Sequence, residues 1–504
     1  MIYISAFFVG LSFLLLPVHS FAQECNPPFE MVTSLFSPSP GADTIWDHAY
    51  GDVDYDYRFA STFMASDGGV LTIGQRRRFD GKYSDLVFVT FDRLGREVAE
   101  HTHELQGVQN IVKVIETDGG YLILANIIRK KQDQIWLGFF DKAFKLKSQR
   151  RFVDRSNHFK ATDIIPSIEN GWVMSISSKP LREQADGQVS EKGLVYLLDE
   201  VGKKILERSY GAGLNDRVSG LSVVKIAGQG VGYIATGGFT NNSGKQVARM
   251  MRLSQTLSLE WQREHSRGLS ANLNQSIGYI QETVLTFGDV QPINGEPSGV
   301  WLALIDVGDG RVLWQRFFHG EARTHNYQAQ GVSVNVDNLI TLLMTARSVS
   351  GQHASDRDGR EVASTSDVDF AQVLTLTPRG ITLGGDSYFF SEGVEMQRLT
   401  FGSGGEHILT GRVLVREEVQ EKGKYRGHHQ SEREPIREAD QVSLPDVEVS
   451  LEAKKGLALL KQKISERPPL VDNDKLAKRD KSLVYKGWVV VTDAYGGYSD
   501  PCIQ

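Results

Sequence analysis

The sequence predicts an all-β protein, a seven-bladed β-propeller in which an N-terminal strand completes the last blade. One unit of alternating apolar residues and Gly-centred turns recurs roughly every 50–65 residues along the chain. The chain has 504 residues with 50 Gly and only 15 Pro, which favours many short strands joined by tight turns. A segment near the N-terminus resembles the fourth strand of a unit, but no first three strands precede it. This indicates that the segment completes the last unit and closes a ring.

The repeated unit is clearest at its hairpins and third strands. Asp67-Gly68-Gly69 and Asp118-Gly119-Gly120 each separate two apolar runs, as in a tight hairpin, because Gly supplies the positive φ that such turns need. Third strands that end in Asp are predicted at 86–92, 135–141, 195–199, 301–306 and 487–493, and further units begin near Phe159, Val218, Ser276, Ala329 and Val394. Units of this kind must stack to bury their faces, and a closed ring leaves no exposed ends.

The two ends of the chain fit a shared last blade. Residues 44–51 match the predicted fourth strands at 205–211 and 313–320, yet no first three strands precede them. The C-terminus stops soon after the third strand that ends at Asp493. We therefore expect the N-terminal strand to complete the last blade. This closure would bring the two cysteines, Cys25 and Cys502, to the same blade, where a disulfide is expected and two unpaired thiols are the alternative.

The N-terminus and the composition bear on location. An apolar run at 6–16, Pro17 and the small–x–small pattern Ser20-Phe21-Ala22 predict a signal peptide at 1–22 that is cleaved after Ala22. A periplasmic or secreted protein without a transmembrane segment is then expected, with an uncleaved anchor as the alternative. Residues 23–43 form an N-terminal segment and 44–504 the propeller. The net charge of −6 argues against a nucleic-acid partner.

One stretch carries a family resemblance. The run Ala303-Leu304-Ile305-Asp306-Val307-Gly308-Asp309-Gly310-Arg311-Val312-Leu313-Trp314 resembles the docking motif of pyrroloquinoline-quinone-type propellers, with one residue inserted. The resemblance implies that Asp306 ends a third strand, Gly310 lies in the turn and Trp314 packs between adjacent blades. Enzymes of that family often have an adjacent Cys pair or a Cys-x-x-Cys-His site, and this sequence has neither. We therefore expect no cofactor, with pyrroloquinoline quinone as the alternative.

A possible metal site lies at the entry to the first blade. Asp52, Asp54 and Asp56 occupy alternate positions, a pattern by which loops supply oxygen ligands to Ca²⁺. Tyr57 and Arg58 stand where the Gly of such a loop would follow. A solvated acidic turn is the expected interpretation, and a Ca²⁺ site is the alternative.

The long insertions point to one face of the ring. They fall between second and third strands, which places them on the face of the blade-to-blade connections, and the longest, 417–482 in the last blade, is charged and predicted to be disordered. In consecutive blades this position carries two basic runs, Arg76, Arg77 and Arg78 followed by Arg129, Lys130 and Lys131. Together they would form a basic patch for a protein or an anionic glycan, and a solvated loop face is the alternative.

These observations predict an exported, monomeric propeller that binds or scaffolds a protein or glycan partner through its loop-rich face without catalysis. The alternative is an envelope enzyme, either quinone-dependent or acting on a polysaccharide from the central funnel. No nucleophile, metalloprotease or phosphate-binding motif occurs in the sequence.

Overall fold

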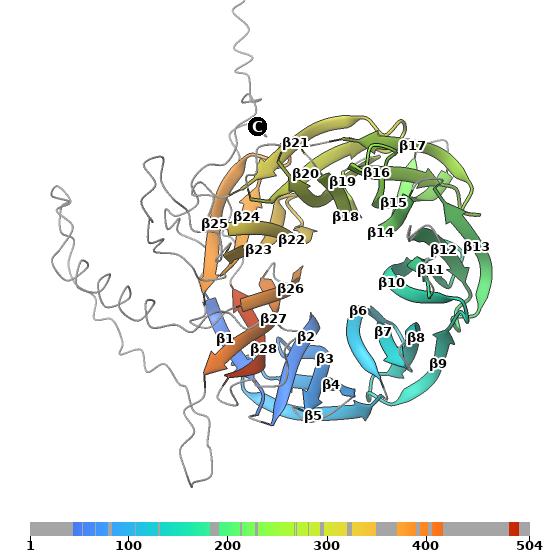
Figure 1. The fold of residues 1–504 in the computed structure, drawn as a ribbon. Helices are drawn as coiled ribbons and strands as arrows, with labels where there is room; N and C mark the ends of the chain where they lie inside the picture. The colour runs from blue at the N-terminus through green and yellow to red at the C-terminus, as the bar shows by residue number, and fades with distance from the viewer. Residues whose placement is uncertain are drawn as a thin grey trace, which may run out of the picture.

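Antiparallel sheets stand around a central axis like the blades of a wheel (Figure 1). The computed structural model describes residues 44–416 and 483–492, except for short gaps at 53, 66, 79–82, 106, 130–131, 182–190, 212–213, 227–229, 267, 269, 281, 293–296, 320–324, 349–369, 390–393 and 402–405. The predicted signal peptide, the insertion at 417–482 and both cysteines lie outside the described residues. In the described ranges no helix has the length and apolarity to cross a membrane.

Five blades are separate four-stranded sheets. The first blade contains β2 (Tyr55–Met64), β3 (Val70–Arg78), β4 (Ser84–Phe91) and β5 (Glu97–Glu104). The second blade contains β6 (Val108–Thr117), β7 (Gly120–Arg129), β8 (Gln132–Asp141) and β9 (Leu146–Phe152). The third blade contains β10 (Asn157–Pro166), β11 (Trp172–Pro180), β12 (Lys192–Leu198) and β13 (Lys204–Tyr210). The penultimate blade contains β22 (His325–Val334), β23 (Ile340–Ser348), β24 (Phe370–Leu376) and β25 (Thr382–Phe389). The closing blade contains β26 (Val394–Phe401), β27 (His407–Arg416), β28 (Leu483–Thr492) and β1 (Thr44–Tyr50).

The remaining strands form one eight-stranded sheet, which corrects the prediction of seven separate blades. This sheet contains β14 (Leu214–Ile226), β15 (Gly230–Thr240), β16 (Gln246–Leu253), β17 (Leu259–His265), β18 (Ser270–Gly278), β19 (Thr283–Gln291), β20 (Gly299–Asp306) and β21 (Val312–Phe318). A parallel pairing of Gln246 with Ser270 joins β16 to β18, and Ser270 Oγ donates to Gln246 Oε1 over 3.0 Å. The periodicity of the sequence indicates the strands within each four-stranded unit. It gives no signal for a hydrogen bond between two units, so the sequence did not predict that two units share one sheet.

The N-terminal strand closes the ring as predicted. β1 pairs antiparallel with β28, with Trp46 opposite Val491 and Tyr50 opposite Gly487. The ring of Tyr50 also packs against Tyr57 and Phe59 of the first blade. The segment therefore belongs to the closing blade and contacts the next one.

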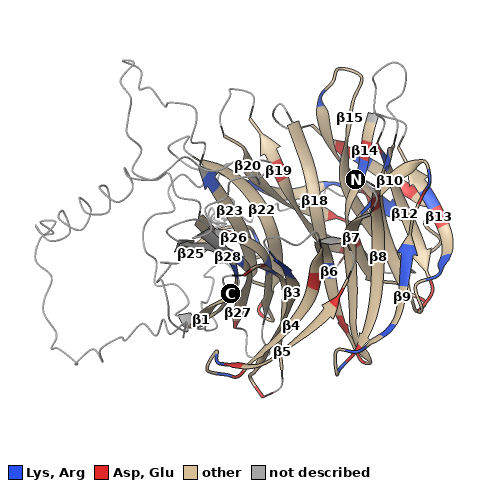
Figure 2. Ribbon diagram, turned by 60° about the horizontal axis from the view of Figure 1, so that its bottom comes forward, with Lys and Arg blue, Asp and Glu red and all other residues tan. Residues whose placement is uncertain are grey.

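The apolar core lies between neighbouring blades. Ile73 and Phe88 of the first blade are fully buried in one cluster with Ile123 and Trp136 of the second blade. Another cluster joins Phe59 of the first blade to closing-blade residues. Charged side chains lie mainly in turns and on outer strands such as β9 and β13 (Figure 2). Because each blade shares its faces with two neighbours, burial of apolar area stabilises the ring as a whole.

The first strand of each four-stranded unit lies nearest the central axis and is called the inner strand here; the inner strands are β2, β6, β10, β14, β18, β22 and β26 (Figure 1). Each inner strand carries a β-bulge at its middle. One residue of the strand has no partner in the second strand, and these residues are Ala60, Val112, Thr162, Ser219, Asn274, Gln330 and Gln397. A bulge bends its strand and changes the direction of the side chain there. The repetition of the bulge sets one level around the axis at which side chains can face the centre.

Candidate binding site in the central channel

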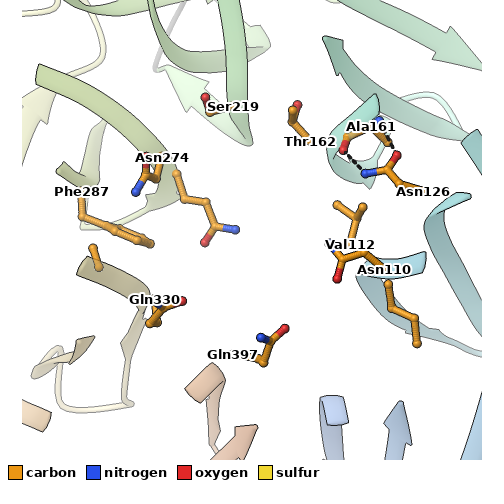
Figure 3. A pocket seen from close by; sticks show the side chains of 13 residues that line it. Asn110, Val112, Asn126, Ala161, Thr162, Ser219, Asn274, Phe287, Gln330 and Gln397 are labelled. Carbon is orange, nitrogen blue, oxygen red and sulfur yellow. Dashed lines mark hydrogen bonds between the residues drawn. The ribbon is translucent and has the colours of Figure 1, made fainter. Parts of the chain in front are cut away.

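A cavity of about 370 Å³ lies at the level of the bulges in the central channel. Side chains from β6, β10, β14, β18, β22 and β26 surround it (Figure 3). Six bulge residues line it, namely Val112, Thr162, Ser219, Asn274, Gln330 and Gln397. The backbone irregularity of the inner strands therefore builds a largely polar wall.

Part of this wall ties neighbouring inner strands together. The side-chain amide of Asn126 donates to Ala161 O over 2.9 Å and accepts from Ala161 N over 2.8 Å, as the dashed lines in Figure 3 show. Thr162 Oγ1 donates to Val218 O over 2.5 Å, which links the third blade to the eight-stranded sheet. These polar groups are satisfied within the protein, so they hold the shape of the cavity.

Other polar side chains of the wall are free to bind. Among the described residues, no hydrogen bond engages the side chains of Asn110, Ser219 or Gln275. Gln330 and Gln397 each donate from Nε2 to a neighbouring side chain, over 3.4 Å and 2.9 Å, and this leaves their amide oxygens available. The cavity thus presents donors and acceptors from several sheets to one open space in the channel.

A buried carboxyl group, Asp289 on β19, stands behind this wall. Asn274 Nδ2 donates to its Oδ2 over 2.7 Å, and the backbone N of Ala329 donates to its Oδ1 over 3.1 Å. Burial raises the pKa of Asp289, and these two hydrogen bonds act in the opposite direction. Asp289 therefore positions Asn274 and joins the eight-stranded sheet to the penultimate blade.

Three charged side chains lie beside the cavity. Lys113 Nζ contacts Asp163 Oδ1 at 2.6 Å, and Asp163 is buried while Lys113 is half-buried. Asp163 also accepts hydrogen bonds from the backbone N of Ile164 and Leu221, both over 2.8 Å. Arg398 directly follows the bulge residue Gln397, and burial lowers its pKa while the Asp163 carboxylate opposes that shift. These three described side chains comprise two cations and one anion.

No family model matches the chain, and no curated protein matches it either. The chain is similar to the β-propeller domain of the Trilobed protease from Pyrococcus furiosus, at 8% identity and a TM-score of 0.37, over 71% of this chain and 89% of that one. It is also similar to a putative exo-β-1,3-galactanase from Bifidobacterium bifidum s17, at 12% identity and a TM-score of 0.29, over 51% and 90% of the two chains. Likeness at this level carries no argument about function.

Only part of the predicted basic patch lies within the described residues. Arg76 and Arg77 form ion pairs within the first blade, Arg76 with Glu100 at 2.7 Å and Arg77 with Asp56 at 3.6 Å. Arg78 ends β3 and Arg129 ends β7, and the repeated topology puts these strand ends on the same face. Lys130 and Lys131 lie outside the described residues. The patch remains a prediction, although its first two cations already have acidic neighbours.

The acidic run at the entry to the first blade is engaged within the protein. Asp52 Oδ1 accepts from the backbone N of Asp54 over 2.9 Å, and buried Asp56 accepts from the backbone N of Tyr485 over 3.2 Å. In the described part of the chain, no three His, Cys, Asp or Glu residues form a group that could hold a metal.

The docking motif lies at a junction between sheets. Asp306 ends β20 and its Oδ1 accepts from the backbone N of Gly308 over 2.7 Å. Trp314 on β21 donates from Nε1 to Pro378 O of the penultimate blade over 3.1 Å. One unit earlier, Trp261 donates from Nε1 to Val307 O over 3.0 Å. Trp314 therefore packs against the turn of the neighbouring sheet.

Sequence reasoning missed the channel wall. The bulge residues occur within ordinary alternating runs, and their residue types share no pattern.

Proposed function

We propose that this chain is a non-catalytic binding protein that takes the end of a glycan into its central channel. The observation that carries the proposal is the set of free amide and hydroxyl groups, Asn110, Ser219 and Gln275, facing one cavity. An amide offers both a donor and an acceptor, which suits sugar hydroxyls because each of these also donates and accepts. The volume falls within the range of about 300–1,000 Å³ that is usual for small-ligand sites.

Two features support binding rather than catalysis. The described residues that line the cavity are neutral, so binding would depend on hydrogen bonds and on the apolar side chain of Phe287. Asp289, the buried carboxylate behind the wall, accepts its two hydrogen bonds from protein groups. Its arrangement supports a role in holding the wall in place.

The test is a glycan array followed by calorimetry of the glycans retained. Asn110→Ala and Gln275→Ala should each weaken binding about 3- to 10-fold, the effect of losing one neutral hydrogen-bonding group. The matched control is Gln255→Ala, since Gln255 is exposed in the turn between β16 and β17. A wild-type protein that retains no glycan, or binding that survives both channel variants unchanged, would overturn the proposal.

We also propose that the protein is exported, because residues 1–22 have the pattern of a cleavable signal peptide. The intact mass of protein purified from cell envelope and medium should correspond to a chain that begins at Gln23. A mass that retains Met1 in those fractions would contradict this proposal.

A further inference from the structure

Arg398 lies on the inner strand β26, directly after a residue that lines the central cavity. It is half-buried on β26, next to Gln397, which lines the cavity. Its charge interacts with that of Asp163 in the third blade. The first and second blades stand between the closing blade and the third blade around the ring (Figure 1), so this interaction runs across the channel.

Asp163 cannot serve as a full partner for Arg398. Its carboxylate already contacts Lys113 Nζ at 2.6 Å and accepts backbone hydrogen bonds from Ile164 and Leu221. Among the residues that the structure describes, which exclude 390–393 and 402–405 on either side of β26, no hydrogen bond or ion pair engages the Arg398 guanidinium. A partly desolvated cation without a partner is unfavourable, and an incoming anion would relieve that cost.

We infer that Arg398 is the receptor for a carboxylate on the ligand, so that the channel selects acidic glycans such as uronic-acid oligomers over neutral ones. A guanidinium matches a carboxylate with two parallel hydrogen bonds, which gives orientation as well as affinity. The neutral groups Asn110 and Gln275 would hold the sugar hydroxyls while Arg398 holds the acid. This inference rests on the proposed function for its glycan and adds the chemical class of that glycan.

The first test compares trigalacturonic acid with its fully methyl-esterified form, in which each carboxylate is replaced by an uncharged methyl ester. The wild type should bind the acid at least about tenfold more tightly. Arg398→Gln should abolish that preference, so that the acid and the ester bind equally. Arg398→Lys should keep part of the preference, because lysine retains the positive charge but not the planar, forked guanidinium. Arg150→Gln, at an exposed arginine on β9, is the matched control and should keep the full preference.

The results separate the inference from the proposed function. Equal binding of acid and ester by the wild type, or an Arg398→Gln variant that keeps the preference, overturns the inference and leaves glycan binding intact. A glycan array on which the wild type binds no glycan overturns the proposed function instead. The anion site at Arg398 is then tested with a small carboxylate in place of a glycan.

That second test uses wild-type protein with ¹⁵N-labelled arginine. Sodium acetate should shift the Arg398 Nε–H resonance, which is assigned by its absence in Arg398→Gln. Acetamide, a neutral molecule of the same shape, should leave the resonance in place at the same ionic strength. If the Arg398 resonance does not move with acetate, the anion site does not exist, whatever the glycan result.

Discussion

Asn126 and Asp289 occupy equivalent positions in their sheets and perform the same task. Each is paired with the residue two places before a bulge, Asn110 for Asn126 and Asn272 for Asp289. Each accepts a hydrogen bond from the inner strand of the next sheet, from Ala161 N over 2.8 Å and from Ala329 N over 3.1 Å. The ring therefore uses one register position twice to join its sheets, once with a neutral amide and once with a carboxyl group.

This equivalence predicts that Asp289→Asn is tolerated better than Asp289→Ala. Asparagine keeps an acceptor for Ala329 N and loses the one for Asn274, so we expect a loss of about 1 kcal/mol at pH 7. Alanine leaves both donors unsatisfied and should cost about 2–3 kcal/mol. Urea unfolding measures both values. Equal losses for the two variants would show that Asp289 does not act as a hydrogen-bonding clamp.

The same residue predicts a dependence of stability on pH. Burial raises the pKa of Asp289 above its ordinary value, so the native state holds this proton more tightly than the unfolded chain does. Stability should therefore fall as the pH rises from the ordinary value through the raised one. The decline should be weaker in Asp289→Asn, because asparagine does not titrate. Parallel pH profiles for variant and wild type would contradict this expectation.

His407 should make the protein sensitive to acid. Burial lowers the pKa of His407 to about 4, so the unfolded chain binds a proton more tightly than the native state. The stability that depends on neutral His407 is fully present above pH 6.5, the ordinary pKa. The free energy of unfolding should fall by about 3 kcal/mol in all as the pH decreases toward 4. His407→Gln should lose less stability than wild type between pH 7.5 and 4.5 in urea unfolding. Gln255→Ala, at an exposed residue that does not titrate, is the control and should follow the wild-type profile.

Trp314 should stabilise the junction between the eight-stranded sheet and the penultimate blade. Its ring lies against Gly380, which has a φ of +74° and where an added Cβ would stand 2.8 Å from Trp314 Cζ3. Trp314→Ala should cost about 2–4 kcal/mol of unfolding free energy, and Trp314→Phe about 1 kcal/mol for the lost hydrogen bond. Leu313→Ala, at the exposed neighbouring residue, should change stability by less than about 0.5 kcal/mol. A Trp314→Ala melting curve that overlays wild type would refute the docking role.

Removal of β1 should open the ring. A chain that starts at residue 51 leaves β28 with an unpaired edge and exposes the aromatic contacts of Tyr50, so we expect association or loss of cooperative melting. Light scattering after size exclusion and thermal melting measure both. A synthetic peptide of residues 44–51 should restore the mass and melting of the wild type, whereas a scrambled peptide should not. A truncated chain with the same number of chains per particle and the same melting as wild type would show that β1 is dispensable.

The sequence alone determined the all-β class, the strand repeat and the pairing of an N-terminal strand into the last blade. These follow from local signals, since alternating apolar residues and Gly-rich turns specify strands, and a strand without a unit of its own must find a partner elsewhere. The fusion of β16 with β18 depends on a contact between the first residues of the two strands, Gln246 and Ser270, for which strand periodicity gives no signal.

Only the tertiary structure decided where the candidate site lies. Asn110, Ser219, Gln275 and Arg398 are far apart in the chain, and each is an unremarkable polar residue in its own strand. Closure of the ring and the repeated bulges bring the first three to one cavity and Arg398 beside it. Such convergence depends on long-range packing and on local irregularities of the backbone, neither of which is encoded in a short stretch of sequence.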